Sequence, residues 1–105
     1  MRELINIVES ARMRLGDLVS VKVGNPDADF WIERRNTIEN VGKPTKEFGP
    51  ERFGITVTRP DVVDANYLFY MMTHLHNQGV WKGVATGSLK LVGIRAEDIR
   101  NIPVG

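Results

Sequence analysis

Two hydrophobic periods follow one another along this chain, and the change comes near Asp64. Before Asp64, short runs rich in β-branched residues are bounded by glycine, asparagine or proline, which is typical of strands. Residues 18–23, 28–35 and 54–58 are such runs. Residues 4–8 fit both a helix and a strand, and their two isoleucines and one valine favour a strand. The first part of the chain is therefore predicted to be mainly β structure.

After Asp64 the apolar residues recur at helical spacing. Four of them lie at positions i, i+3, i+4 and i+7 of one helical face: Leu68, Met71, Met72 and Leu75. Asp64 is a suitable N-cap residue and Gly79 a suitable C′ residue, so the pattern predicts a helix over residues 64–78. Tyr67 and Tyr70 flank the apolar stripe, with their hydroxyl groups directed toward water or a partner.

The last part of the chain is expected to form short elements. In order, they are a helical turn over residues 80–85, a turn at Thr86-Gly87-Ser88, a strand over residues 89–92 and a short helix over residues 96–101. Trp81 and Val84 are expected to point inward from the first of these elements. The acidic residues in the first turn of the predicted helix over residues 96–101 interact favourably with its helix dipole.

Together these elements predict a single α+β domain over residues 1–105. Its expected architecture is one mixed, curved β-sheet with the helix of residues 64–78 packed on it. The strands of this sheet are expected at residues 4–8, 18–23, 28–35, 54–58 and 89–92. The second and third of them are expected to pair antiparallel across a tight turn. The expected core contains Val57, Leu68, Met71, Met72, Leu75, Trp81 and Ile99.

Composition narrows the class of protein. The 105 residues are 42% hydrophobic and 26% charged, which is typical of one globular domain. There is no cysteine, so disulfides and thiolate metal sites are excluded. The net charge of +1, from 14 basic and 13 acidic residues, excludes a strongly acidic DNA mimic and a basic field around the whole protein. With no signal-peptide pattern and no apolar run of membrane-spanning length, a cytoplasmic location is expected.

A basic segment lies between the predicted strands. Residues 36–53 are rich in glycine, proline and asparagine and are expected to form a long loop. Five cations fall in or beside it: Arg34, Arg35, Lys43, Lys46 and Arg52. Because four glutamates dilute this charge, the loop is either a solvated surface or a segment that contacts phosphates. In the second case Asn36, Asn40 and Thr45 are candidates to read base edges.

No arrangement of residues predicts catalysis or a cofactor. His74 and His76 are two positions apart on the predicted helix and point to different faces, which disfavours a metal pair. The serines lack a nucleophile-elbow context, and the glycines do not form a phosphate-binding loop. A small enzyme acting through Glu33 or His74 ranks last. The protein is therefore expected to be a non-enzyme without a cofactor or metal.

A family resemblance rests on the order of motifs along most of the chain. These motifs are Gly16-Asp17-Leu18-Val19, Val57-Thr58, Tyr67-Leu68-Phe69-Tyr70-Met71-Met72, Ala85-Thr86-Gly87-Ser88, Leu91-Val92-Gly93-Ile94 and Asp98-Ile99-Arg100-Asn101-Ile102-Pro103-Val104. This order resembles the target-recognition domain of type I restriction–modification specificity subunits. In that family the domain recognises half of a bipartite DNA sequence and has no catalytic chemistry. The spacer helix and proline-rich segment that follow in the family have no counterpart after Val104, so the expectation is a stand-alone relative, a phage-borne protein or a domain with a changed role.

The resemblance implies a non-catalytic module that binds double-stranded DNA. It implies that Thr86, Gly87 and Ser88 face the duplex together with the basic loop. Lys82 and Lys90 flank the first of these segments. The alternative is a protein-interaction module of the same fold that joins a restriction–methylation complex without binding DNA. As a recognition domain the protein is expected to form a homodimer or to be a subunit of a restriction–methylation complex, because recognition domains usually act in pairs and one small domain makes few contacts.

Overall fold

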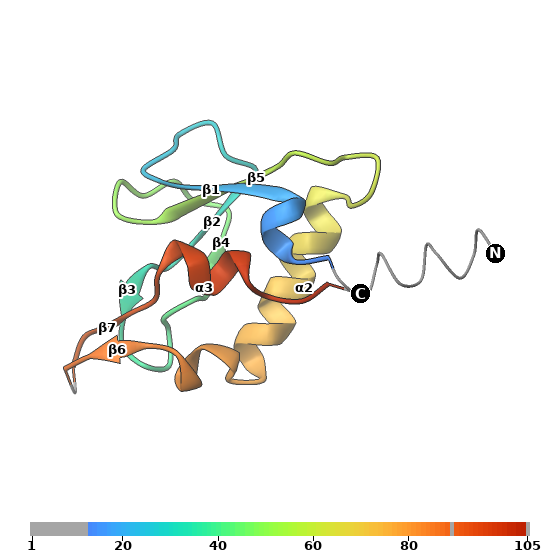
Figure 1. The fold of residues 1–105 in the computed structure, drawn as a ribbon. Helices are drawn as coiled ribbons and strands as arrows, with labels where there is room; N and C mark the ends of the chain where they lie inside the picture. Colours follow the sequence, from blue (N-terminus) through green and yellow to red (C-terminus); the bar gives the residue numbers. More distant parts are fainter. Residues whose placement is uncertain (1–12, 89, 105) are drawn as a thin grey trace.

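A computed structural model describes residues 13–88 and 90–104 of the chain (Figure 1). The strands are β1 (Val19–Val23), β2 (Phe30–Ile32), β3 (Arg35–Asn36), β4 (Pro44–Thr45), β5 (Phe53–Val57), β6 (Thr86–Gly87) and β7 (Val92–Gly93). The helices are η1 (Leu15–Asp17), α2 (Ala65–Asn77), η2 (Val80–Gly83) and α3 (Ala96–Arg100), of which η1 and η2 are 3-10 helices. The predicted α+β class is therefore confirmed, as are the main helix and the short helix near the C-terminus.

The strands form two sheets, so the prediction of one mixed sheet is wrong. A four-stranded sheet has the order β1-β5-β2-β4, and a three-stranded sheet has the order β3-β7-β6. All the strand pairs in both sheets are antiparallel. Figure 1 shows the smaller sheet beside α3, at the end of the molecule away from the loop that joins β5 to α2. The strand predicted over residues 4–8 lies outside the described residues.

Strand β5 lies between β1 and β2, so the predicted direct pairing of these two strands is wrong. The loop over residues 24–29 returns across β5 at Gly54. A Cβ atom at Gly54 would lie 2.9 Å from the Cβ atoms of both Asn25 and Ala28, so only glycine leaves room for this crossing. The indole Nε1 of Trp31 donates a hydrogen bond to the Asn25 carbonyl oxygen at 2.8 Å and fixes the loop over the sheet.

The strand predicted over residues 28–35 is divided between the two sheets. β2 ends at Ile32, and the backbone of Glu33 then bonds to the segment before β4. Glu33 N donates to the Lys43 carbonyl oxygen at 3.1 Å, and Gly42 N donates to the Glu33 carbonyl oxygen at 2.8 Å. The chain bends at Arg34, whose carbonyl oxygen accepts from Ile94 N at 3.1 Å, and it continues as β3 of the smaller sheet. The predicted long loop then contains β4, which pairs with β2.

The segment after α2 differs from its prediction in three places. Thr86 and Gly87 are strand β6 rather than part of a turn, and they pair with β7 in a hairpin. Of the strand predicted over residues 89–92, only Val92 belongs to a strand, since β7 begins there. Leu89 lies outside the described residues. Trp81 is buried as predicted, whereas Val84 is 45% exposed, so its inward prediction is wrong. Val84 is the C-cap residue of η2, which ends at Gly83, so it lies outside the helical turn that places Trp81 in the core.

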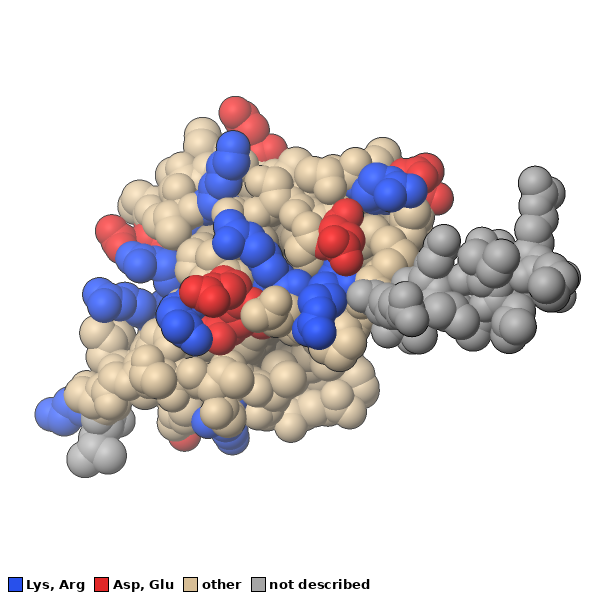
Figure 2. Space-filling model, viewed as in Figure 1, with Lys and Arg blue, Asp and Glu red and all other residues tan. Residues whose placement is uncertain are grey.

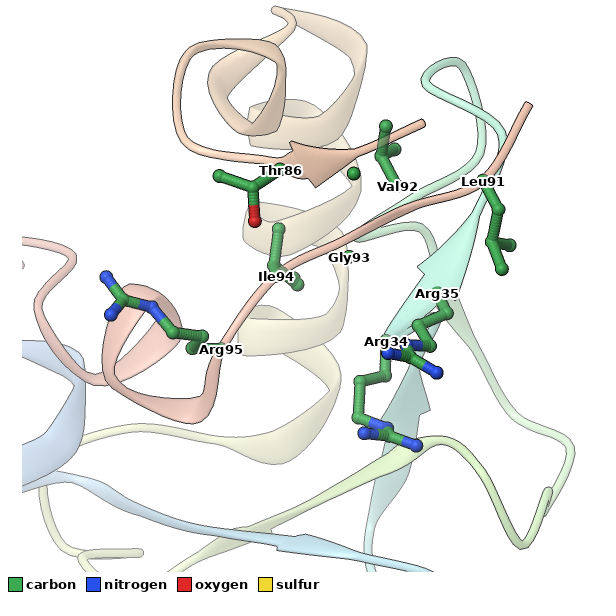
Figure 3. Close-up of a pocket in the computed structure, with 9 residues that line it drawn as sticks. Arg34, Arg35, Thr86, Leu91, Val92, Gly93, Ile94 and Arg95 are labelled. Carbon is green, nitrogen blue, oxygen red and sulfur yellow. The ribbon is translucent and has the colours of Figure 1, made fainter. Parts of the chain in front are cut away.

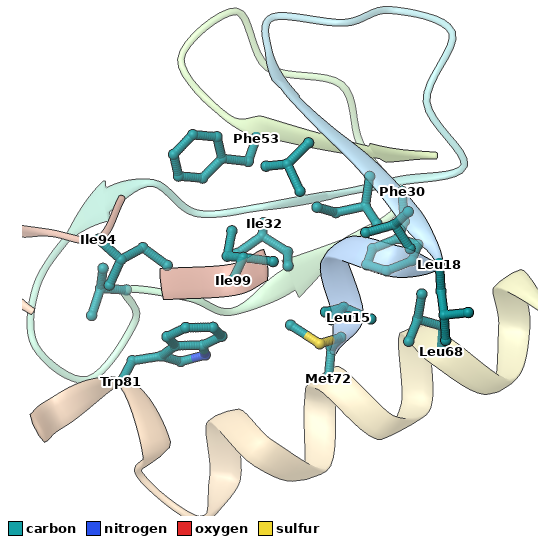
Figure 4. Packing of buried hydrophobic residues seen from close by; sticks show 14 residues of the cluster. Leu15, Leu18, Phe30, Ile32, Phe53, Leu68, Met72, Trp81, Ile94 and Ile99 are labelled. Atoms are coloured by element: carbon teal, nitrogen blue, oxygen red, sulfur yellow. The ribbon is translucent and has the colours of Figure 1, made fainter. Parts of the chain in front are cut away.

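The core lies between the four-stranded sheet on one side and α2, η2 and α3 on the other (Figure 4). The Asp64 carboxylate caps α2 by accepting from the backbone N–H groups of Asn66 and Tyr67, each at 3.1 Å. Four predicted core residues are buried: Leu68, Met72, Trp81 and Ile99. The other three, Val57, Met71 and Leu75, are half-buried at the edge of the cluster. Among the described residues, no helix combines the length and the apolar character that crossing a bilayer requires.

Candidate nucleic-acid interface

The smaller sheet forms one wall of a shallow pocket of about 300 Å³. It brings together two segments that are far apart in the chain, β3 and the β6–β7 hairpin. The lining residues are Arg34, Arg35, Thr86, Gly87, Leu91, Val92, Gly93, Ile94 and Arg95. Three of them are arginines and none is acidic. Figure 3 shows Arg34 and Arg35 together at one end of this pocket and Arg95 near the other end.

The register of the sheet explains why the pocket forms. Arg35 pairs with Gly93 of β7, and Gly93 pairs with Thr86 of β6, so these three residues form one row across the sheet. Directly opposed residues of antiparallel strands have their side chains on the same face. Arg35 and Thr86 therefore face the same side, and Gly93 between them has no side chain to fill the space. A Cβ atom at Gly93 would lie 3.3 Å from the Cγ of Arg35, so the glycine also lets the arginine stem lie against the sheet.

Gly87 and Ser88 build the hairpin. Gly87 has a φ of +146°, and a Cβ atom there would lie 2.4 Å from the Leu91 carbonyl oxygen. The Ser88 Oγ accepts from Leu91 N at 3.1 Å and lies 3.3 Å from the Leu91 carbonyl oxygen. The hydroxyl group that was expected to face DNA is therefore engaged within the turn. Of the three predicted residues in this segment, Thr86 places its side chain in the pocket row and the other two hold the hairpin.

The three arginines differ in their partners. Arg34 Nη2 lies 2.6 Å from the Glu51 carboxylate, and its Nε donates to the Glu51 backbone carbonyl oxygen at 3.0 Å. Arg95 lies 3.6 Å from Asp98 and 4.0 Å from Glu97, both in α3. Among the described residues, Arg35 has no carboxylate within 4.0 Å. Arg35 is therefore the cation of this pocket that is most available to an external anion.

Besides Lys90, four of the predicted basic residues lie outside the pocket lining: Lys43, Lys46, Arg52 and Lys82. Lys46 Nζ donates to Asn66 Oδ1 at 3.2 Å and lies 4.5 Å from the Phe69 ring centroid, so it fastens β4 to α2. The half-buried Arg52 donates from Nε to Glu33 Oε1 at 2.7 Å and supports the bend before β3. Lys43 and Lys82 are exposed to solvent, and neither of them lines the pocket.

Two further predicted residues lie beside the pocket. Asn36 is in β3, but its Oδ1 accepts from Thr37 N at 2.8 Å, so this amide is engaged locally. Lys90 is exposed in the hairpin turn. Figure 2 shows the Lys and Arg surfaces of one face interleaved with Asp and Glu surfaces rather than joined into one basic groove. A ligand bound by these cations would therefore contact individual side chains rather than one continuous basic surface.

Arg95 is the charged lining residue that sequence reasoning missed, and Gly93 at the centre of the row was missed as well. The position of Arg95 directly before the acidic first turn of α3 indicates helix capping, and its backbone N does donate to Asp98 Oδ2 at 2.7 Å. Only the pairing of β7 with β3 brings this arginine to the same pocket as Arg34. The described residues contain no group of three or more His, Asp or Glu side chains arranged to hold a metal ion.

Comparisons with known proteins give no family for this chain. A scan against protein-family models, a search of curated proteins and a search of solved structures found no match to it.

Proposed function

We propose that this protein is a non-catalytic module that binds double-stranded DNA through the smaller sheet. The observation that carries the proposal is the row formed by Arg35, Gly93 and Thr86, beside Arg34 and Arg95. Two segments that were separately expected to contact DNA line one pocket. The pocket offers arginine and hydroxyl donors and has no carboxylate in its lining.

The donors of the pocket suit the phosphate backbone. A guanidinium group presents two N–H groups side by side, which matches the oxygens of a phosphate. Glycine in the floor lets a ligand approach the backbone closely. Phosphate contacts position a protein on the duplex without reading its sequence. The β6–β7 hairpin adjoins this pocket, and a two-stranded ribbon is narrow enough to enter a major groove. The resemblance to a target-recognition domain points to the same function.

A salt titration tests the proposal. The affinity of the full chain for a fluorescently labelled duplex of random sequence is measured by anisotropy between about 50 and 200 mM salt. We expect binding at low salt that weakens linearly on a log–log scale, because each neutralised phosphate releases condensed counterions. Binding that is absent at the lowest salt, or that does not change with salt, contradicts the proposal.

A second function is favoured by a different surface. Tyr67 and Tyr70 are 64% and 71% exposed on α2, and Tyr67 borders an apolar groove together with Val62 and Met71. Exposed tyrosines are frequent anchors of protein interfaces. We propose as the alternative a protein-interaction module that joins a restriction–methylation complex. It predicts that Tyr67→Ala and Tyr70→Ala abolish activity in such a complex, whereas the Arg34→Gln and Arg35→Gln changes leave it intact.

Two further properties accompany the DNA-binding proposal. A homodimer is proposed because one small domain contacts few base pairs, and sedimentation velocity with and without duplex tests it. A cytoplasmic location is proposed because a restriction-related module acts where DNA is accessible.

A further inference from the structure

We propose that the Glu51 carboxylate occupies the place of a ligand phosphate on Arg34, and that a phosphate group binds between Arg34 and Arg35 by displacing it. This inference rests on the proposed function in taking phosphate as the ligand group. It goes further in assigning the atoms that hold the phosphate and the residue that competes with it. The ligand chemistry is a phosphate group, either a phosphodiester of a duplex or free phosphate.

Arg34 is held in place independently of the Glu51 carboxylate. Its side chain is only 26% exposed, and its Nε donates to the Glu51 backbone carbonyl oxygen at 3.0 Å. The carboxylate contacts a different nitrogen, Nη2, at 2.6 Å. When the carboxylate leaves, the backbone hydrogen bond still fixes the guanidinium group. A preorganised donor of this kind binds an anion without a further cost in side-chain entropy.

The Glu51 side chain is free to leave. It is 80% exposed, whereas the Glu33 side chain, which pairs with Arg52, is 18% exposed. An exposed ion pair contributes little to stability, because water screens the charges and the side chain loses entropy when it is held. Near neutral pH free phosphate carries more charge than a carboxylate, whereas a phosphodiester carries the same single charge. Both kinds of phosphate present oxygens that can bond two guanidinium groups at once, so a phosphate gains a contact that the Glu51 carboxylate lacks.

Arg35 makes the exchange favourable. Figure 3 shows Arg34 and Arg35 at the same end of the pocket, and the described residues place no carboxylate within 4.0 Å of Arg35. Of these two neighbouring cations, only Arg34 contacts a carboxylate in the described part of the chain. A phosphate between the two guanidinium groups contacts both and removes their mutual repulsion. The pocket that both arginines line, about 300 Å³ in volume, leaves room for it.

The test compares two variants that change the net charge equally, Glu51→Gln and Glu47→Gln. Glu47 is exposed in the same loop, and among the described residues its carboxylate has no basic group within 4.0 Å.

Inorganic phosphate is titrated at constant ionic strength into the ¹⁵N-labelled full chain, and the side-chain Nε signals of the arginines are followed by NMR. We expect Arg34 and Arg35 to respond. We expect Glu51→Gln to saturate at about twofold to fivefold lower phosphate than the wild type, which is the range that an exposed ion pair is worth. Glu47→Gln should match the wild type.

Equal behaviour of the two variants, or no response of Arg34 and Arg35, overturns the inference. The same two variants are then tested with the labelled duplex. If the duplex binds but Glu51→Gln and Glu47→Gln bind it equally, the inference fails while the proposed function stands. If the duplex does not bind but Glu51→Gln tightens the binding of inorganic phosphate, the proposed function fails while the inference stands.

Discussion

Replacing Gly42 with alanine should destabilise the protein more than any other glycine-to-alanine change in the helical and loop segments around the pocket. Gly42 has a φ of +80°, which L-residues rarely adopt. A Cβ atom there would lie 2.1 Å from Cδ1 and 2.3 Å from Nε1 of the buried Trp81 indole. The contact joins the turn after β3 to η2, the element before β6, so it holds together the two segments that form the pocket.

The magnitude follows from two separate costs. The left-handed conformation costs an alanine roughly 1–2 kcal/mol. Forcing a methyl group into the packed indole costs about 1–3 kcal/mol more, because the ring must shift within the core. Together these costs give a loss of roughly 2–5 kcal/mol in the free energy of unfolding. In a domain of this size each kcal/mol lowers the Tm by about 4–8 °C.

Gly83→Ala is the matched control. Gly83 lies in η2 close to Trp81 in sequence, has no positive φ, and a Cβ atom there would meet nothing within 4 Å. We expect this change to be neutral or to stabilise the protein by up to about 1 kcal/mol, since alanine restricts the unfolded chain. Urea unfolding followed by tryptophan fluorescence measures both variants. Equal unfolding midpoints for Gly42→Ala and Gly83→Ala would refute the reasoning.

Two further substitutions test the N-cap of α2 and the Arg52–Glu33 ion pair at the bend before β3. Asp64→Ala removes the N-cap of α2 and should cost about 1 kcal/mol in urea unfolding; no loss would mean that water replaces the carboxylate. Arg52→Ala leaves the half-buried Glu33 without its partner and should cost about 1–3 kcal/mol. The control Arg59→Ala should stay within about 0.5 kcal/mol, since its pair with Asp61 is exposed. In that pair, the hydrogen bond from Arg59 lowers the pKa of Asp61. Equal losses for the two arginine variants would contradict this distinction.

Local patterns in the sequence were sufficient to predict most of the helices. The stripe that contains Leu68 and Met72 predicts α2, and its cap at Asp64 is where the structure has it. The buried Trp81 and Ile99 also follow from periodicity. These features depend on residues within a few positions of one another, so a local pattern contains the information.

Strand pairing could not be predicted in the same way, because it depends on distant partners. The run of residues 28–35 looks like one strand, yet it divides where Glu33 pairs with Arg52 and with the backbone before β4. The crossing of the 24–29 loop over Gly54 is equally non-local. A β-branched run identifies a strand but does not identify its neighbour.

The candidate interface was predicted in part for the same reason. Arg34, Arg35, Thr86 and Gly87 were expected to face DNA, and they line one pocket. Lys46 and Arg52 carry the same charge but fasten elements of the fold, which only their contacts reveal. Arg95 was missed because its sequence neighbours indicate only a helix cap.

The most direct test of the account is the salt dependence of duplex binding in the Arg35→Gln variant, with Arg59→Gln as control. Arg35 lies in the central row of the pocket, whereas Arg59 lies in the loop before α2, at the other end of the molecule (Figure 1). We expect Arg35→Gln to weaken binding similarly for all duplex sequences and to lower the log–log salt slope by about one, because one phosphate contact is lost. Arg59→Gln should bind like the wild type. Equal affinities and slopes for the two variants would contradict the claim that the smaller sheet contacts DNA.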